Sequence, residues 1–315
     1  MPRTFTAPVT GFIPVMPTAF SSNGDVDYNG MDAMVDFFIK NGASGLFTVC
    51  LTSEMYHLTP EERLELVSRV VKRAQASGFK GPVLATGTFG GPVNLQADSV
   101  RRTAEAGANI VVLLPNQLAA ETEDDALLSE RIDALLSMTD DIPLGLYECP
   151  SPYHRLTTPE LISTCGKSGR FYYIKETTGR PEEALAKVAA AKETSLSVFN
   201  AHQPSLLSFL QGGGEGVSPI GANVSPRLNS ELCNCFESDP ERAKGLQQAV
   251  VDVSEQIRHR YPLDLKWYMN KKGLPIEPFC RAVSNELTAA DRDELDRETA
   301  LIDRILDKYS VSNLV

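Results

Sequence analysis

Lys175 ends a run of apolar and aromatic residues in the stretch FYYIKETTG (171–179). Burial makes the ammonium form costly and shifts a lysine toward the neutral amine, which is a nucleophile. Such an amine attacks a 2-oxo acid, loses water to give an iminium, and draws electrons from the adjacent carbon, so that a C–C bond there can break or form. The alternative is a lysine held in a structural ion pair by a neighbouring carboxylate, Glu148 or Glu176.

A second reactive side chain, Tyr147, ends the preceding apolar run IPLGLY. If both runs are β-strands, side chains alternate between the two faces, and Lys175 shares its face with Tyr173 and Thr177. Tyr147 and Lys175 then stand at the C-terminal ends of neighbouring strands, which lie about 4.8 Å apart. A phenol in that position can shuttle the protons that imine chemistry requires.

The strands that carry these residues belong to a repeated pattern. Short apolar runs recur, each followed by a longer amphipathic segment, which makes eight strand–helix units. No GxGxxG turn follows the first strand, which disfavours an open, doubly wound sheet. The pattern predicts a closed (β/α)8 TIM barrel, an α/β fold whose chemistry lies at the C-terminal ends of the strands. The expected barrel helices are 27–41, 60–77, 92–107, 124–138, 158–167, 181–193, 203–211 and 226–237.

The alternation stops at about residue 240, where three further helical stretches are expected, near 240–259, 264–272 and 288–308. We therefore expect residues 1–238 to form the barrel and residues 239–315 to form a C-terminal helical extension. Such a short helical set buries too little surface to be stable alone, so it should pack on the barrel or on another subunit.

The composition is that of an acidic globular protein. Its 315 residues are 42% hydrophobic, and 30 basic against 41 acidic side chains give a net charge of -11. Such a surface repels phosphate backbones and anionic lipid heads, so no nucleic-acid or membrane partner is expected. No apolar run is long enough for a signal peptide or a membrane span, and six scattered cysteines fit a reducing compartment, which together predict a cytoplasmic protein.

Four motifs taken together connect this chain to a known family. They are GLYECP around Tyr147, YYIKET around Lys175, TSEMYHLTPEER after the second expected strand, and GGGEGVSPIGANVSP around the eighth. In this order they resemble the dihydrodipicolinate synthase/N-acetylneuraminate lyase family, from about Gly11 to Arg227, with a similar helical region beyond. The resemblance implies a class I aldolase, a related condensing enzyme or a dehydratase of 2-oxo sugar acids. It also implies a homodimer or homotetramer with no metal or organic cofactor.

The resemblance assigns roles to single residues. It makes Lys175 the Schiff-base lysine, Tyr147 the proton-shuttling phenol, and Thr52 one of the residues that hold the carboxylate of pyruvate or of a longer 2-oxo acid. An aldehyde is a possible co-substrate. The further expected substrate-binding residues are Ser53, Thr177, His202 and Ile220.

Three positions depart from the synthase pattern. Leu51 replaces the first hydroxyl residue of the Gly-Thr-Thr-Gly-Glu or Gly-Ser-Thr-Gly-Glu motif, and it can neither hold a carboxylate nor relay a proton. Gln117 replaces a tyrosine that completes a relay across a dimer interface, and Pro152 lies where an arginine binds the aldehyde partner. A lysine-pathway synthase is therefore disfavoured. A binding or scaffold protein without turnover is the alternative, and a metal-dependent aldolase is a third possibility that the four histidines do not favour.

Four further side chains are secondary candidates. His202 could contact a substrate hydroxyl or carboxylate, or could be a loop histidine without a role. His57 and Tyr56 lie in the loop after the second strand, and Arg155 could replace the missing arginine or be a surface charge. The glycine run GGGEG (212–216) follows a helix and enters a strand, which predicts a helix C-cap and a turn in place of a phosphate loop.

Overall fold

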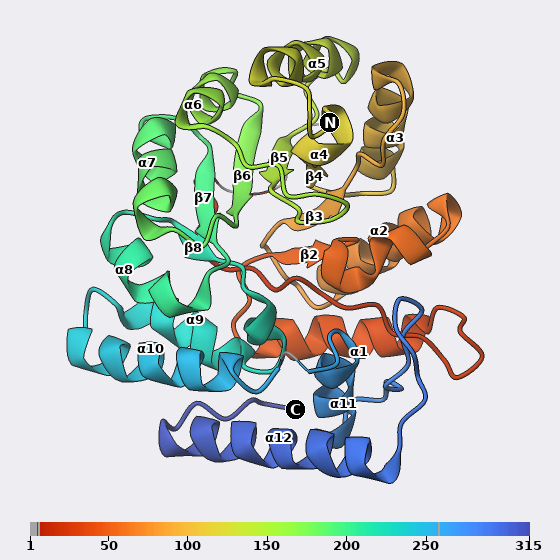
Figure 1. Ribbon diagram of the computed structural model, residues 1–315, viewed down its shortest axis with the longest axis vertical. Coiled ribbons are helices and arrows are strands. Elements are labelled where there is room, and N and C mark those ends of the chain that lie inside the picture. Colours follow the sequence, from red (N-terminus) through yellow and green to blue (C-terminus); the bar gives the residue numbers. More distant parts are fainter. Residues whose placement is uncertain (1–4, 6, 258) are drawn as a thin grey trace.

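The computed structural model describes residue 5 and residues 7–257 and 259–315. Eight parallel strands form one sheet in the order β1-β8-β7-β6-β5-β4-β3-β2. The ring closes between its first and second segments, where the amide of Phe47 donates to the Pro14 carbonyl (3.0 Å) and that of Met16 donates to Phe47 (2.9 Å). The predicted (β/α)8 barrel is confirmed (Figure 1). The strands are β1 (Gly11–Phe12), β2 (Leu46–Thr48), β3 (Val83–Thr86), β4 (Ile110–Leu113), β5 (Leu144–Tyr147), β6 (Phe171–Glu176), β7 (Ser197–Asn200) and β8 (Gly216–Val217).

The helices around the barrel begin and end within about two residues of the predicted limits, except that residues 203–205 form a 3-10 turn. Thr59 caps one of them with a reciprocal capping box that includes Glu62. The glycine run ends a helix at Gly212, as expected. The barrel helices are α1 (Tyr28–Lys40), α2 (Pro60–Ala76), α3 (Val93–Glu105), α5 (Asp125–Met138), α6 (Pro159–Lys167), α7 (Pro181–Ala191), α8 (Leu206–Gln211) and α9 (Pro226–Cys235).

Short helical turns follow several strands, and the sequence pattern did not reveal them. Most of them are 3-10 turns of three or four residues, which are too short to show an amphipathic period. They place backbone and side chains at the C-terminal end of the barrel, where the site lies. They are η1 (Leu51–Ser53), η2 (Met55–His57), α4 (Pro115–Leu118), η3 (Gln203–Ser205) and η4 (Ile220–Asn223).

Aromatic side chains fill the barrel interior below Lys175. The ring of Tyr173 lies 5.9 Å from that of Phe47 and 4.9 Å from that of Phe199, centroid to centroid. The Tyr173 hydroxyl donates to Ser218 Oγ at 3.0 Å, so its only polar atom is satisfied. The floor of the barrel mouth is therefore apolar and closely packed, which excludes water from the base of the site.

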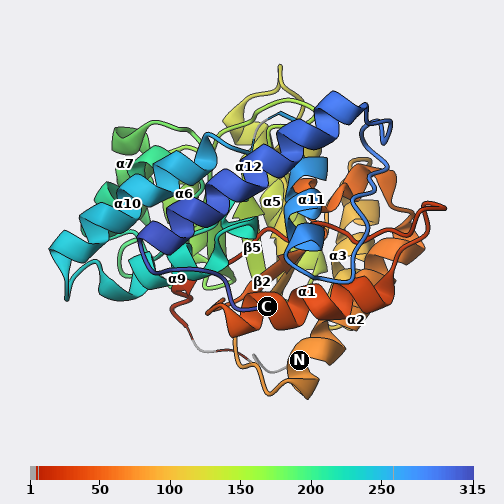
Figure 2. The same cartoon turned by 90° about the horizontal axis from the view of Figure 1, so that it is seen from below.

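The C-terminal extension lies along one side of the barrel, next to α1 and α9 (Figures 1 and 2). Its helices are α10 (Pro240–Ser254), α11 (Leu263–Lys271) and α12 (Ala289–Lys308), and α10 packs on α9. The helix expected over 240–259 ends at Ser254, and its predicted residue 258 lies outside the described residues. Near the C-terminus, the Leu314 amide donates to Asn41 Oδ1 on the barrel side (2.7 Å). Within the described ranges, no helix is both long and apolar enough to cross a membrane.

Candidate functional site

A pocket of about 480 Å³ opens at the C-terminal ends of the strands. Its walls come from the loops after β2, β5, β6, β7 and β8 and from the segment between α10 and α11. Of the expected site residues, Lys175, Tyr147, Thr177, His202 and Ile220 line it. The full lining is Leu51, Tyr147, Pro150, His154, Lys175, Thr177, Gly179, Ala201, His202, Gln203, Ile220, Ile257 and Tyr261.

Lys175 lies at the base of this pocket. The strand register pairs it directly with Tyr147, and its Nζ lies 4.9 Å from the centre of the Tyr147 ring. Only 3% of the residue is exposed, and desolvation lowers the pKa of its amine to about 8, against the weaker opposing influence of Cys50 and Cys149. At pH 7 the ammonium form still predominates, but roughly a tenth of the amine is neutral, far more than for a lysine of ordinary pKa, and the neutral form is the nucleophile.

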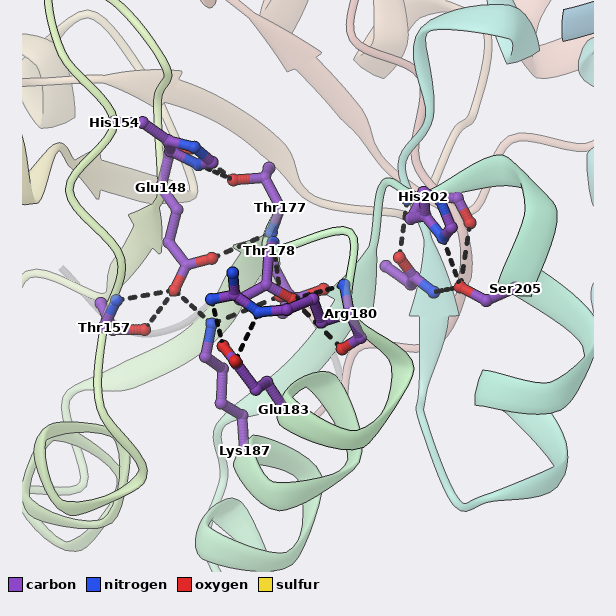
Figure 3. A network of polar contacts seen from close by, with 12 residues as sticks. Glu148, His154, Thr157, Thr177, Thr178, Arg180, Glu183, Lys187, His202 and Ser205 are labelled. Carbon is purple, nitrogen blue, oxygen red and sulfur yellow. Dashed lines mark hydrogen bonds and ion pairs between the residues drawn. The ribbon is translucent and has the colours of Figure 1, made fainter.

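The carboxylates that could have neutralised Lys175 pair with another lysine. Lys187 on α7 places its Nζ 2.5 Å from Glu148 Oε1 and 3.3 Å from Glu176 Oε1 (Figure 3). Glu148 also accepts bonds from the amides of Thr157 (2.8 Å) and Thr177 (2.9 Å). The structural ion-pair alternative is therefore wrong for Lys175, and this buried pair instead fixes the loops that flank the site.

Lys175 differs from the other buried lysines in having no counter-ion. Lys175, Lys187 and Lys266 are the buried lysines of the described chain, and the last two form ion pairs with buried glutamates. Among the described residues, no carboxylate forms an ion pair with Lys175. A buried cation without a counter-ion is costly, which makes Lys175 the candidate functional group of this pocket.

The phenol of Tyr147 is buried beside Lys175. Its pKa is raised well above the ordinary value, first by desolvation and then by the neighbouring Cys149, Cys50 and Tyr261. The phenol therefore stays protonated over the physiological pH range. The protonated phenol is a hydrogen-bond donor, and the thiol of Cys149 is one of its polar neighbours.

The turn η1 after β2 holds the expected carboxylate-binding residues. Thr52 is 1% exposed, and its Oγ1 accepts a hydrogen bond from the phenol of Tyr261 at 2.8 Å. The Ser53 hydroxyl donates to the Met16 carbonyl (2.6 Å) and accepts from the Cys50 amide (2.9 Å). Ser53 is thus committed to the shape of the turn, and neither Ser53 nor Thr52 is among the described residues that line the pocket.

The opposite wall carries two imidazoles. His154 Nε2 lies 2.8 Å from Thr177 Oγ1, which in turn donates to the Glu148 carbonyl (2.6 Å). His202 Nδ1 lies 2.9 Å from Ser205 Oγ, so its ring is held in one orientation (Figure 3). This wall presents polar side chains to the pocket.

The other three secondary candidates, His57, Tyr56 and Arg155, lie outside the pocket lining. Arg155 is buried, donates to the carbonyls of Ala120 (2.6 Å) and Glu123 (2.9 Å), and pairs with Asp125 (2.8 Å). It is therefore a loop anchor, neither a surface charge nor a pocket group. Tyr56 donates to the Ser151 carbonyl at the rim (2.9 Å).

Several residues that line the pocket were not predicted as site residues: Pro150, His154, Gly179, Ala201, Gln203, Ile257 and Tyr261. His154 and Gln203 follow β5 and β7 directly, so the rule that barrel loops carry the chemistry could have found them. Ile257 and Tyr261 belong to the C-terminal extension, and no local pattern relates that region to the barrel mouth.

Outside the pocket, three potential metal ligands lie close together on the extension. His259, Glu294 and Glu298 bring one ligand atom each within 4.8 Å of the others. Two of these three residues are exposed. Acidic surface clusters of this kind are common, so this one gives no reason to expect a metal.

With this geometry in place, comparison with known proteins decides the family. The family model described as "Dihydrodipicolinate synthetase family" matches residues 8–301. The chain belongs to this family. The match includes both the barrel and most of the C-terminal extension.

Curated relatives in the dihydrodipicolinate synthetase family are similar to this chain at low identity. The 4-hydroxy-tetrahydrodipicolinate synthase of Stutzerimonas stutzeri (strain A1501) is 26% identical over 84% of this chain and 89% of its own length. The synthase of Methylococcus capsulatus (strain Bath) is 27% identical over the same shares. At this distance the family is clear, and the substrate has to be argued from the site.

Solved structures support the fold of the family member described here. YagE, an Escherichia coli K12 prophage protein of the dihydrodipicolinic acid synthase family solved in complex with pyruvate, has a TM-score of 0.82 at 22% identity. That alignment covers 96% of this chain and 99% of YagE. The synthase of Methylacidiphilum fumariolicum SolV has a TM-score of 0.83 at 20% identity, covering 96% of this chain and 98% of its own. The oligomeric state of this chain stays a prediction.

Proposed function

We propose that this protein is a Schiff-base lyase or aldolase that binds pyruvate or a sugar-derived 2-oxo acid at Lys175. The single observation that carries the proposal is the lysine itself: a buried amine at the barrel mouth with a lowered pKa and no ion-pair partner among the described residues. A scaffold protein without turnover would gain stability by replacing or pairing that lysine. The YagE complex with pyruvate adds support, because pyruvate is the simplest 2-oxo acid.

The proposed reaction is a retro-aldol cleavage. Lys175 Nζ adds to the C2 carbonyl carbon of the 2-oxo acid, the carbonyl oxygen is protonated and leaves as water, and an iminium remains. The iminium withdraws the electron pair of the C3–C4 bond, while the C4 hydroxyl loses its proton and becomes the aldehyde. Protonation of the enamine at C3 and hydrolysis release pyruvate and the free lysine. The same iminium permits condensation in reverse, or elimination of water from C4 and C3.

Tyr147 is the proposed proton shuttle in this sequence. Its phenol stands beside Lys175 and stays protonated, so it can donate to the departing oxygen and take a proton from the C4 hydroxyl. Thr52, which the family resemblance implies as a carboxylate ligand, lies in the turn across the mouth.

The lining also restricts the distal half of the substrate. Apart from Lys175, the described lining residues include no lysine or arginine, and the two imidazoles are the other groups that can carry positive charge. Leu51, Ile220 and Ile257 supply apolar wall. We propose that the distal half is an uncharged aldehyde or hydroxyaldehyde, because a second carboxylate would be desolvated without a permanent cation.

Borohydride trapping tests the imine directly. Reduction in the presence of pyruvate should attach a stable adduct to the peptide that contains Lys175, as mass spectrometry would detect. The yield should rise with pH through about 8, because the neutral amine is the nucleophile.

A panel of 2-oxo-4-hydroxy acids with neutral or anionic distal ends should show pyruvate release from the neutral ones. If no 2-oxo acid of the panel gave an adduct at Lys175, the proposed function would be wrong.

A Tyr147→Phe variant should keep the imine and lose most of the turnover. Removing a positioned proton donor typically lowers rates about 10²- to 10⁴-fold, so kcat for aldol cleavage should fall by roughly that factor. Stopped-flow assay of pyruvate release measures it. The matched control is Tyr172→Phe, whose hydroxyl donates to the Gly169 carbonyl at the opposite end of β6 (3.1 Å) and should leave kcat unchanged. Equal kcat in both variants would exclude Tyr147 as the shuttle.

A further inference from the structure

Tyr261 brings the C-terminal extension into the pocket. It lies between α10 and α11, about 200 positions along the chain from the turn η1, yet its side chain lines the same pocket as Lys175 and Tyr147. Its phenol donates to Thr52 Oγ1 at 2.8 Å. Burial raises the pKa of this phenol, so it remains a hydrogen-bond donor at any physiological pH.

Bonds between Glu54 and the C-terminal extension hold the contact between Tyr261 and Thr52 in place. On the Thr52 side, Glu54 forms a buried ion pair with Lys266 of α11 (2.5 Å). The second carboxylate oxygen of Glu54 accepts from the amides of Arg281 (2.6 Å) and Ala282 (2.7 Å). The turn η1 and the extension are therefore locked together two residues from Thr52, so that the position of Tyr261 relative to η1 is fixed.

The hydrogen bond from Tyr261 determines which further hydrogen bond the Thr52 hydroxyl can form. A threonine hydroxyl has one proton and two lone pairs. Because Oγ1 of Thr52 accepts from Tyr261, its own proton is available for an acceptor other than Tyr261. Leu51, the preceding residue, lines the pocket and can supply no second hydroxyl. Thr52 itself is buried behind the lining residues, and the family resemblance is what implies its role as a carboxylate ligand; Tyr261, which does line the pocket, determines the orientation of its hydroxyl.

We propose that Tyr261 is a positioning residue for the 2-oxo acid, supplied in cis by the C-terminal extension. It orients Thr52 so that the threonine hydroxyl donates to the substrate carboxylate, and together with Ile257 it forms part of the wall of the pocket that Lys175 also lines. The extension is therefore part of the active site as well as a packing element. This inference rests on the proposed function, because the carboxylate is that of the acid bound at Lys175.

The test is a comparison of Tyr261→Phe with Tyr309→Phe, a phenol of the same extension that does not line the pocket. Loss of one hydrogen bond near an anion should raise the KM for the 2-oxo acid about 5- to 30-fold in Tyr261→Phe, with kcat changed less than about threefold. Tyr309→Phe should match wild type. The concentration of pyruvate that gives half-maximal borohydride trapping at Lys175 should shift by the same factor.

A double variant distinguishes positioning from a separate contact. Thr52→Val should raise KM by a similar factor, and Tyr261→Phe combined with Thr52→Val should add little to either single change, because both remove one interaction. Additive effects, or an unchanged half-maximal pyruvate concentration in Tyr261→Phe, would overturn the proposal.

If Tyr261→Phe failed to fold, comparison of Thr52→Ser with Thr52→Val would test the same hydroxyl: only Val should raise KM, and equal values would overturn the proposal. Absence of a Lys175 adduct in wild type would instead refute the proposed function.

Discussion

A Lys175→Met variant should lose the Schiff-base reaction completely and yet be more stable than wild type at pH 7. The loss follows because methionine offers no amine, so neither imine nor borohydride adduct can form. Residual pyruvate release should not exceed the rate without enzyme. Methionine fills the same apolar channel with an unbranched chain of similar length, so the packing should be preserved.

The gain in stability comes from the cost of the buried ammonium. The pKa of Lys175 is lowered from 10.5 to about 8, which corresponds to about 3 kcal/mol against the charged form at pH 7. Between about pH 8 and 10.5 the unfolded state binds more protons than the folded state, so wild type gains stability as pH rises through that window. The advantage of Lys175→Met should be full below pH 8 and shrink above it.

Chemical denaturation of both proteins at pH 7 and pH 9.5 measures this difference. Lys175→Arg is the control that keeps the charge and removes the nucleophile: it should be inactive without any gain in stability. A Lys175→Met variant that is less stable than wild type at pH 7 would show that the lysine is not a strained cation and would weaken its assignment as the nucleophile.

The barrel was predictable because its elements are locally encoded. Alternation of strand and helix patterns depends on residues a few positions apart, and caps such as Thr59 with Glu62 mark helix starts within one turn. The pairing of Tyr147 with Lys175 followed from two strand ends and the period of two residues. These relations need no knowledge of tertiary packing.

The remaining site features depend on contacts between distant parts of the chain. Lys187 and Lys266 form ion pairs with glutamates that are distant in sequence. The spacing of residues along the chain does not indicate such pairs, so it could not show which buried lysine lacks a counter-ion. Tyr261 stands 209 positions from Thr52, in a region whose helical pattern predicts only packing. Ser53 looked like a substrate ligand in the sequence motif, but its hydroxyl is committed to the carbonyl of Met16, an interaction that only the folded turn reveals.

Breaking the buried pair between Lys266 and Glu54 should cause a large loss of stability. Both side chains are almost fully buried, and Lys266 also donates to the Phe279 carbonyl at 2.7 Å. A Lys266→Met variant leaves the Glu54 carboxylate buried without its cation, which typically costs about 3–5 kcal/mol of unfolding free energy. Urea denaturation at pH 7 measures this change.

Two comparisons separate burial of charge from loss of packing. Lys271→Met, which removes a half-exposed pair with Asp296 (2.8 Å), should change stability by less than about 1 kcal/mol. Lys266→Met combined with Glu54→Gln should recover much of the loss, because no buried charge remains and the amide oxygen can still accept from the amides of Arg281 and Ala282. If Lys266→Met lowered the free energy of unfolding no more than Lys271→Met does, the ion pair between Lys266 and Glu54 would not be what anchors the extension to η1. The position of Tyr261 in the pocket wall would then have to depend on the packing of α10 and α11 alone.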